Sequence, residues 1–275
     1  MTPRLLLLSL LFIFHLSAFA QKKVNNPDYI IYKKVDTTTL KMRVLYPDSL
    51  KENKLYPCVV FFFGGGWKTG NLNQFMNQAK HFNQKGMICF LVDYRVQSRQ
   101  GTTPFESLKD AKSAIRFIRQ NAMRFQINKD AVVASGGSAG GHLAAATALI
   151  DSFNEATDEL SISPKPNALI LFNPVIDNGP GGYGFERIGD AYKSFSPLHN
   201  IQKGAPPTII FLGTKDNLIP VQTVQYYKTV MEKVGSRCDV FLYEGATHGF
   251  FNKEIYLEKT LAEADKFLLS LEFIK

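Results

Sequence analysis

The chain has 275 residues, a formal net charge of +8 at pH 7 and an ordinary globular composition with 45% hydrophobic residues. This composition excludes a low-complexity or disordered protein, and the length is sufficient for one domain with a sizeable core. The basic residues are scattered and no nucleic-acid-binding motif accompanies them. We therefore expect a solvated basic surface and no nucleic-acid partner.

The first twenty residues have the layout of a secretory signal peptide. Arg4 precedes a mainly apolar run over residues 5–19, and Ala18-Phe19-Ala20 offers small residues at the two positions that a signal peptidase reads. A membrane anchor is the alternative, but the apolar run is short for a spanning helix of about 20 residues. We expect cleavage near Ala20, export to the periplasm or the medium, no membrane span in the mature chain, and one domain over residues 21–275.

Strand-like and helix-like segments then alternate along the chain. An opening antiparallel pair is predicted at 29–35 and 40–46, and buried strands are predicted at 58–63, 87–94, 131–135, 168–172, 208–212 and 239–243. Helical periodicity is found over 104–125, 139–150, 221–234 and 257–271. This alternation predicts an α/β fold, with a mostly parallel sheet and helices on both faces.

The segment 180–196 fits neither period. It is rich in glycine and aromatic residues and follows a predicted strand. Sheets of this kind place ligand-contacting residues after the strands, so we expect a long loop or a small lid here.

The strongest local signature is Gly136-Gly137-Ser138-Ala139-Gly140, between the predicted strand 131–135 and the helix that follows it. A serine at a sharp strand-to-helix turn leaves little room around it, and small residues two before and two after it permit that turn. The helix start also directs N–H groups and partial positive charge towards the serine. An incidental serine in a glycine-rich turn is the alternative, but the context favours Ser138 as a nucleophile.

A serine hydroxyl needs a base to take its proton, and the mature chain offers His81, His142, His199 and His248. In sheets with this strand–turn–helix arrangement the partners follow in the order serine, acid, histidine, which excludes His81. His142 lies about one helical turn after Ser138, where a packing role is expected, and His199 precedes the favoured acid. His248 lies in a loop after the strand 239–243, and we predict that it is the base.

The acid that orients the base is expected in the loop after the preceding strand, 208–212. Asp216 lies in that loop, within Gly213-Thr214-Lys215-Asp216-Asn217. Its role would be to hold the imidazole tautomer and to stabilise the imidazolium. Asp177 and Asp190 are alternatives, since Asp177 also follows a strand, but the position of Asp216 favours it.

The early buried strand ends in Gly64-Gly65-Gly66-Trp67. Glycines let backbone N–H groups approach a developing negative charge, and removing one such donor typically lowers the rate by about 10²–10³. The N–H of Ala139, directly after the nucleophile, should complete this oxyanion hole. A merely flexible turn is the alternative, but the position of the glycines ahead of the serine favours the hole.

Cys58 and Cys89 lie in apolar strand-like runs, which predicts buried free thiols. A Cys58–Cys89 bridge in an oxidising compartment stays open as an alternative. Together with Cys238, these cysteines show no zinc-ligand spacing. The sequence therefore predicts neither a metal nor a cofactor.

These residues resemble the α/β-hydrolase superfamily, and within it the hormone-sensitive-lipase-like and the acetylxylan- and feruloyl-esterase-like carboxylesterases. The resemblance covers nearly all of the mature chain and rests on GGGW at 64–67, DYR at 93–95, GGSAGGH at 136–142, GTKD at 213–216 and ATHGFF at 246–251. It implies an α/β-hydrolase fold and a catalytic triad of Ser138, Asp216 and His248. By the same resemblance, the N–H groups of Gly65, Gly66 and Ala139 supply the oxyanion donors.

The resemblance has one departure, at Phe63. Those branches usually carry a histidine at this position, where it braces the oxyanion loop by hydrogen bonds without acting as the base. Its loss leaves the triad complete. We expect Phe63 to brace the loop by packing instead.

The residues and the resemblance together predict an exported serine carboxylic-ester hydrolase of short-chain acyl esters. No long lid insertion is present, which disfavours long-chain lipids, and acetyl esters of polysaccharides are the favoured substrates. The predicted partner is thus a small-molecule or carbohydrate ester. A prolyl-oligopeptidase-like peptidase is the nearest rival, although that family carries a propeller domain for which this chain is too short. A formamidase-like amide hydrolase and a non-catalytic protein of the same fold are further alternatives, and the complete triad disfavours the last.

Overall fold

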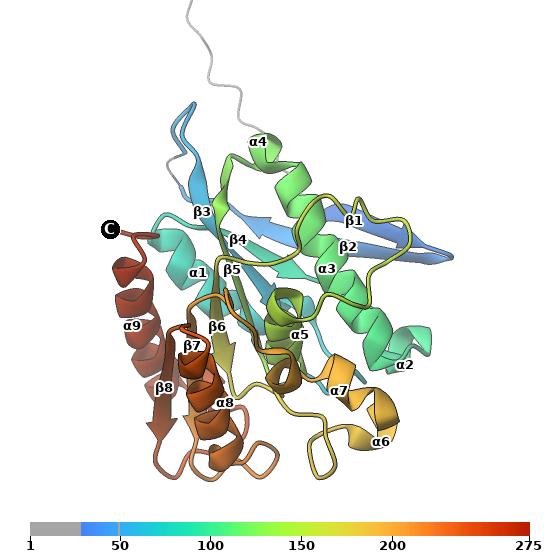
Figure 1. The fold of residues 1–275 in the computed structure, drawn as a ribbon. Coiled ribbons are helices and arrows are strands. Elements are labelled where there is room, and N and C mark those ends of the chain that lie inside the picture. The colour runs from blue at the N-terminus through green and yellow to red at the C-terminus, as the bar shows by residue number, and fades with distance from the viewer. Residues whose placement is uncertain (1–28, 49) are drawn as a thin grey trace, which may run out of the picture.

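The structure, a computed structural model, describes residues 29–48 and 50–275, so the predicted signal peptide lies outside the described residues. This part of the chain forms an eight-stranded sheet in the order β1-β2-β4-β3-β5-β6-β7-β8 (Figure 1). β1 (Tyr29–Val35) pairs antiparallel with β2 (Thr38–Leu45), and β2 pairs antiparallel with β4. The parallel strands are β3 (Tyr56–Phe62), β4 (Ile88–Val92), β5 (Ile127–Gly137), β6 (Ala168–Phe172), β7 (Thr208–Gly213) and β8 (Cys238–Tyr243).

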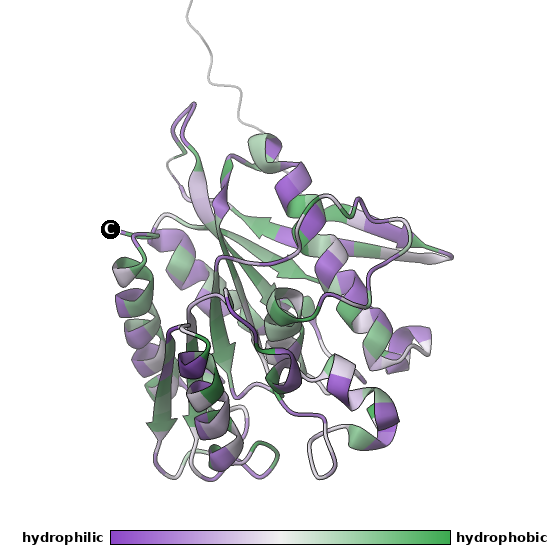
Figure 2. Cartoon of the chain, viewed as in Figure 1, coloured by the Kyte–Doolittle hydropathy of each residue, from purple (hydrophilic) through white to green (hydrophobic). Residues whose placement is uncertain are grey.

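Helices cover both faces of the sheet, as the alternation of elements predicts. α3 (Pro104–Gln120), α5 (Ala139–Leu149) and α8 (Val221–Lys233) pack on one face and share its core. α1 (Met76–Gln84) and α9 (Glu254–Ser270) pack on the other face (Figure 1). Because both faces are covered, every residue of β4 and β6 is buried, which is why these strands have continuous apolar sequences. In Figure 2 these inner strands are green, and the helices carry their purple, hydrophilic residues outwards.

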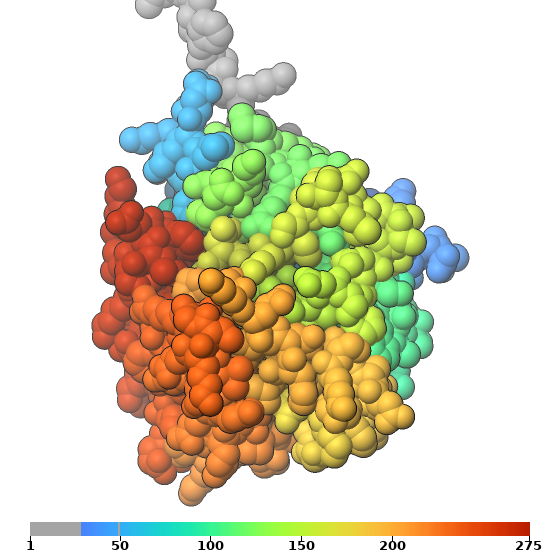
Figure 3. Space-filling view, in the orientation of Figure 1, coloured from blue at the N-terminus to red at the C-terminus, as the bar shows by residue number. Residues whose placement is uncertain are grey.

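α5 differs from the other long helices because all of its residues are buried. A helix that is apolar all round belongs in a protein interior, and the alanine-rich sequence lets it lie close to the sheet. The segments 151–167 and 180–200 cover the surface between α3 and α8 (Figure 3). The turn that carries Ser138 therefore precedes one of the most enclosed elements of the described chain.

The bounds of most other elements shift by one to four residues from those predicted, and two predicted segments differ in kind from the structure. The predicted helix 104–125 divides at Asn121 into α3 and α4 (Ala122–Phe125), and the predicted loop or lid 180–196 contains α6 (Phe185–Ile188), η2 (Gly189–Ala191) and α7 (Tyr192–Phe195). Gly184 and Gly189 bound α6 with φ angles of 84° and 57°, so these turns stay too short to show a helical period. The other short elements are η1 (Leu72–Phe75), α2 (Gln97–Gln100), η3 (Pro197–Asn200) and η4 (Phe250–Asn252).

α1 was not among the predicted helices. Its sequence, MNQAKHFNQ, is mostly polar, and only Gln78, Ala79 and Phe82 are buried. Its apolar face is thus too narrow to be recognised by periodicity alone, and the helix is stabilised by packing against the sheet.

An ion-pair cluster ties the edge of the sheet to α3. The fully buried carboxylate of Asp110 contacts Lys33 Nζ at 2.7 Å and Arg95 Nε at 2.7 Å. Glu155 also contacts both cations, at 2.8 and 3.1 Å. These ion pairs join β1 to α3 and to the loop after α5. Each buried charge has a partner of opposite sign, so none is left unpaired in the interior.

Candidate active site

Ser138 lies at a strained turn between β5 and α5. Its φ and ψ angles are 53° and −119°, a combination that non-glycine residues rarely adopt. The turn is held by backbone hydrogen bonds, because Ser138 N donates to Phe172 O at 3.0 Å and Val175 N donates to Ser138 O at 3.1 Å. A Cβ on Gly140, two residues after Ser138, would collide with the carbonyl oxygen of Phe62. A glycine is therefore required at this position for α5 to approach β3. The side chain of Ser138 is thereby presented at the carboxyl edge of the sheet.

His248 and Asp216 are brought together from the loops that follow β8 and β7. His248 Nδ1 lies 2.8 Å from Asp216 Oδ2. The Asp216 side chain is fully buried, and its Oδ1 accepts hydrogen bonds from Leu218 N at 2.9 Å and Ile219 N at 3.0 Å. These donors fix the carboxylate, and an acceptor facing Nδ1 assigns the ring proton to that atom.

The Ser138 and His248 side chains line the same cavity of about 230 Å³. Gly65 and Gly66 from the loop after β3 line it as well. Among the described residues, no hydrogen bond joins the Ser138 hydroxyl to His248, as is common before substrate is bound. The cavity therefore has a serine, an acid-supported imidazole and a glycine loop at one edge of the sheet.

Three backbone N–H groups at this cavity are available to a ligand. In the part of the chain that the structure describes, no loop or side-chain acceptor takes a hydrogen bond from the N–H of Gly65, Gly66 or Ala139. Gly65 and Gly66 have φ angles of 134° and 64°, which glycine adopts readily because it has no Cβ. Ala139 opens α5, so the positive end of the helix dipole adds to the field near Ser138.

Phe63 braces the glycine loop by packing, as expected from its replacement of the family histidine. Its ring stacks on Tyr94 with centroids 4.0 Å apart, and Tyr94 Oη donates to Phe63 O at 2.6 Å. Two further contacts were not anticipated from the sequence: Gly64 N donates to Gln74 Oε1 at 2.6 Å, and Arg187 Nη1 donates to Gly66 O at 2.5 Å. Tyr94 belongs to the DYR motif, but no local pattern marks Gln74 or Arg187.

Asn173 is another cavity residue that sequence reasoning missed. It follows β6 directly, is buried, and has a φ angle of 34°. Its Oδ1 accepts from Gly249 N at 3.1 Å, and its Nδ2 lies 3.4 Å from His248 Nε2. The tripeptide Asn173-Pro174-Val175 offers a weak signal at most, because an asparagine after a strand is common in ordinary turns.

The remaining histidines have other partners. His142 is fully buried, and its Nε2 lies 3.0 Å from Phe195 O, in agreement with the packing role predicted for it. His81 pairs with Asp265, and His199 lies 3.8 Å from Asp177. Of the three acids considered, the structure brings Asp216 to His248 and does not bring Asp177 or Asp190 there.

The three cysteines are buried and free, so the alternative of a Cys58–Cys89 bridge is not realised. Burial raises the pKa of the Cys58 and Cys238 thiols to about 12. Within the described ranges, no group of three or more His, Cys, Asp or Glu residues could hold a metal ion, and no helix is long and apolar enough to cross a membrane.

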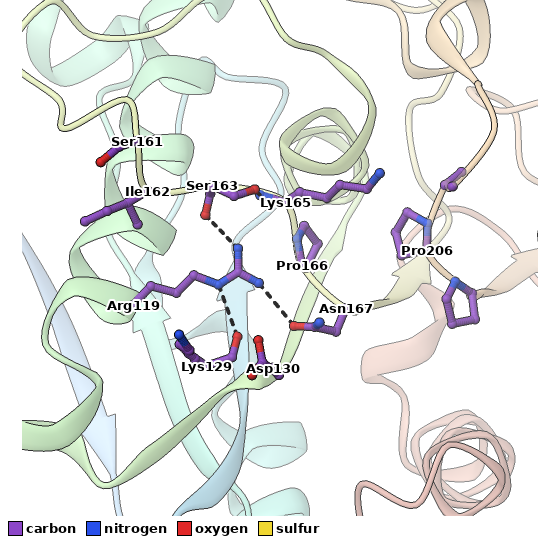
Figure 4. Close-up of a pocket in the computed structure, with 13 residues that line it drawn as sticks. Arg119, Lys129, Asp130, Ser161, Ile162, Ser163, Lys165, Pro166, Asn167 and Pro206 are labelled. Atoms are coloured by element: carbon purple, nitrogen blue, oxygen red, sulfur yellow. Dashed lines mark hydrogen bonds between the residues drawn. The ribbon is translucent and has the colours of Figure 1, made fainter.

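A larger cavity, of about 710 Å³, lies at the opposite, amino edge of the sheet (Figure 4). Arg119 is central to it and donates to Lys129 O, Ser163 O and Asn167 Oδ1 at 3.3, 2.6 and 3.1 Å (Figure 4). The guanidinium thus joins the loop before β6 to β5. Since neither Ser138 nor His248 lines this cavity, the smaller cavity is the candidate active site.

Comparison with known families agrees with this geometry. The BD-FAE family model matches residues 42–180, and the dienelactone hydrolase family model matches residues 181–275. The chain belongs to the α/β-hydrolase esterases. The predicted α/β-hydrolase fold is thereby confirmed.

Among solved structures, the chain is similar to esterase 2 of Thermogutta terrifontis. With that esterase phosphoramylated by tabun, the identity is 42% and the TM-score 0.86, covering 90% of this chain and 96% of that chain. The propionate-bound and butyrate-bound structures of the same thermophilic esterase, at 41% and 40% identity, both give TM-scores of 0.85 with the same coverage.

More distant relatives are also esterases by name. An acetylxylan esterase of Xylanibacter ruminicola is 28% identical over 218 residues, which are 73% of this chain and 42% of that protein. A probable carboxylic ester hydrolase of Mycobacterium tuberculosis, LipM, is 27% identical over 206 residues, which are 65% of this chain and 45% of that protein. The chain thus spans less than half the length of these curated relatives.

Proposed function

We propose that the protein is an exported serine carboxylic-ester hydrolase, with Ser138 as nucleophile, His248 as general base and Asp216 as the acid that orients it. The observation that carries this proposal is the 2.8 Å contact between His248 Nδ1 and Asp216 Oδ2, behind a cavity that the strained Ser138 also lines. Strain at a serine on a sharp turn is typical of an activated nucleophile. The esterase relatives support the same reaction class.

The proposed reaction is acyl transfer in two steps. The Ser138 hydroxyl attacks the ester carbonyl carbon while His248 Nε2 takes its proton, and Asp216 stabilises the resulting imidazolium. The tetrahedral intermediate collapses, the alcohol leaves, and His248 protonates it. Water then attacks the acyl-enzyme, gives its proton to the same histidine, and releases the carboxylic acid and free Ser138.

The negative oxygen of each tetrahedral intermediate would accept hydrogen bonds from the N–H groups of Gly65, Gly66 and Ala139. Their lack of other acceptors in the described chain supports this role. Such donors act strongly because they are already oriented before the charge develops.

Short acyl groups are the proposed substrates, with acetyl esters of polysaccharides as one natural form. The cavity of about 230 Å³ is bounded by Tyr183 and Phe251, which leaves space for a small acyl chain beside Ser138. The propionate-bound and butyrate-bound structures of the Thermogutta esterase support short acids, and the acetylxylan esterase relative supports an acetylated saccharide.

Hydrolysis of p-nitrophenyl acetate, butyrate and decanoate tests the proposal. We expect turnover to fall with chain length, and Ser138→Ala to lower kcat for the acetate by at least about 10³-fold with an unchanged melting temperature. Ser194→Ala, at an exposed serine in α7, is the matched control and should retain wild-type rates. A Ser138→Ala protein with wild-type turnover would contradict the assignment.

Two further measurements separate the parts of the proposal. Esterase 2 of Thermogutta has been observed phosphorylated by paraoxon, so mass spectrometry should locate a paraoxon adduct on Ser138 here. Acetate released from acetylated xylan or pectin would support the saccharide substrate. Activity on the p-nitrophenyl esters without release from any polysaccharide in a broad panel would count against the saccharide part alone.

Export is proposed on the N-terminal sequence, with residues 1–20 as the cleaved signal peptide and residues 21–275 as the mature domain. Such cleavage would leave all the described residues in the mature chain, because the first of them is Tyr29.

A further inference from the structure

Asn173 contacts the His248 loop with both ends of its amide. Oδ1 accepts a hydrogen bond from Gly249 N at 3.1 Å, and Nδ2 lies 3.4 Å from His248 Nε2. A backbone N–H can only donate, so the atom that faces Gly249 N must be the amide oxygen. The amide NH₂ therefore faces His248 Nε2.

This orientation has a consequence for the imidazole. The NH₂ group of Asn173 is a donor, so the Nε2 atom facing it must present its lone pair. The Asp216 carboxylate accepts at Nδ1, so the ring proton lies on that atom. The two side chains thus favour the same tautomer, the one in which Nε2 can receive a proton from Ser138.

The backbone of Asn173 is held firmly enough to support this role. Asn173 N donates to Phe211 O at 2.7 Å, and the residue is fully buried between the nucleophile strand β5 and the acid strand β7. Its φ angle of 34° lies in the left-handed region, which asparagine, aspartate and glycine adopt most readily.

We propose that Asn173 is a positioning residue for the general base, which anchors the His248 loop through Oδ1 and keeps Nε2 of the neutral ring unprotonated through Nδ2. The inference rests on the proposed function for its catalytic meaning. When Ser138 transfers its proton, Nε2 becomes an N–H and no longer accepts from the amide. Asn173 therefore favours the neutral ring before the attack and again after the proton has passed to the leaving alcohol.

Asn173→Asp and Asn173→Gly separate the effect of the Oδ1 contact with Gly249 N from that of the Nδ2 contact with His248 Nε2. Aspartate retains an acceptor for Gly249 N and tolerates the left-handed backbone, but it has no donor for Nε2. Glycine tolerates the same backbone and removes both contacts. A melting temperature near that of the wild type in both variants shows that the fold is retained.

With p-nitrophenyl acetate at pH 7, we expect kcat to fall at least about 10-fold in both variants, with KM within about twofold of the wild type. In Asn173→Asp the new carboxylate stabilises the imidazolium, so the acid limb of the kcat/KM profile should move upwards by about 1–3 pH units. The ionisable side chain that contacts the ring among the described residues is Asp216, which is common to all variants. Wild-type kcat in the glycine variant, or an unmoved acid limb in the aspartate variant, would overturn the proposal.

Asn252→Asp is the matched control for added charge. Asn252 Oδ1 accepts from Gln78 Nε2 at 3.2 Å, and no hydrogen bond joins this residue to His248 in the described chain. We expect its acid limb to move less than that of Asn173→Asp. An equal shift would mean that any nearby carboxylate has the effect, and it would overturn the specific role of Asn173.

A readout without turnover separates this inference from the proposed function. Nitrogen-15 NMR of the His248 imidazole should show the neutral wild-type ring protonated at Nδ1, and Asn173→Asp should increase the Nε2-protonated or imidazolium form at the same pH. If the wild type lacked Ser138-dependent esterase activity but showed this tautomer pattern, the function would fail and the positioning would stand. Protonation of the neutral wild-type ring at Nε2 would overturn the positioning itself.

Discussion

Burial decides the charge of His142, one helical turn from Ser138. The ring is fully buried, stacks on Phe195 with centroids 4.4 Å apart and meets the edge of Trp67. Desolvation lowers the pKa of His142 from 6.5 to about 3, although its contacts with Phe195 O and Asn178 oppose the shift. The side chain is thus a neutral packing residue at physiological pH, and His248 is the histidine available for proton transfer.

This lowered pKa predicts how stability depends on pH. Below pH 6.5 the unfolded chain binds a proton at His142 and the folded chain does not until about pH 3, so stability should fall as the pH falls through this window. One such proton corresponds to a slope of about 1.4 kcal/mol per pH unit. His142→Gln offers an amide donor and does not titrate, so its free energy of unfolding should fall less steeply. Urea denaturation from pH 7 to pH 4 measures both slopes, and equal slopes would contradict the prediction.

At the scale of elements, the segment 180–196 contributes structure to the active site from a distance in sequence. Arg187, at the end of α6, donates to Gly66 O, and its guanidinium lies 5.3 Å from the ring centroid of Trp67. The same guanidinium lies 5.6 Å from the ring centroid of Tyr183, whose ring is 6.0 Å from that of Trp67. The predicted loop or lid is therefore a support of the oxyanion loop as well as a wall of the cavity.

Removing this support should slow catalysis. We expect Arg187→Met to lower kcat on p-nitrophenyl acetate about 10-fold, because the donor to Gly66 O is lost and the oxyanion donors lose their alignment. Arg187→Lys retains the charge without the planar fork and should recover only part of the rate. Arg124→Met, at an arginine next to Phe125 in α4, is the control. A wild-type kcat in Arg187→Met would show that the loop needs no such support.

Most elements were predictable because their signals are local. The strands β1 and β6 have the predicted bounds, and the buried run of β4 is apolar throughout because helices cover both faces. α1 was missed because so little of it faces the core. The short helices of 180–196 were missed because each spans only three or four residues, too few to show a helical period.

At the scale of the whole molecule, the parallel sheet brings together residues that are far apart in the chain. The parallel strands β3, β5, β6, β7 and β8 all end at the carboxyl edge. The loops that follow them therefore bring together the glycine loop, Ser138, Asn173, Asp216 and His248. The larger cavity at the amino edge is instead lined by Arg119, whose guanidinium donates hydrogen bonds to oxygens of the protein itself. Fold topology thus separates the edge that carries the candidate active site from the edge that Arg119 ties together.

Export would act on the whole chain, and it predicts a defined mature N-terminus. Expression of residues 1–275 in a bacterial host with a functional secretion system should yield protein that begins at Gln21 and is found outside the cytoplasm. N-terminal sequencing and cell fractionation measure this. A protein that keeps Met1 and sediments with membranes would indicate the anchor alternative instead, and a variant that begins at Gln21 should be retained in the cytoplasm.

The alternation of elements, the sharp turn at Ser138 and the pairing of Asp216 with His248 could be predicted from the amino-acid sequence. These features depend on short-range patterns: a hydrophobic period, small residues around a serine, and charged residues directly after strands. The hydrogen bonds of Asn173, Gln74 and Arg187, and the dimensions of the cavity, emerged only from the folded molecule. They form where segments that are distant in sequence come into contact. The geometry of such contacts is set by packing across the whole sheet, and no local sequence pattern encodes it.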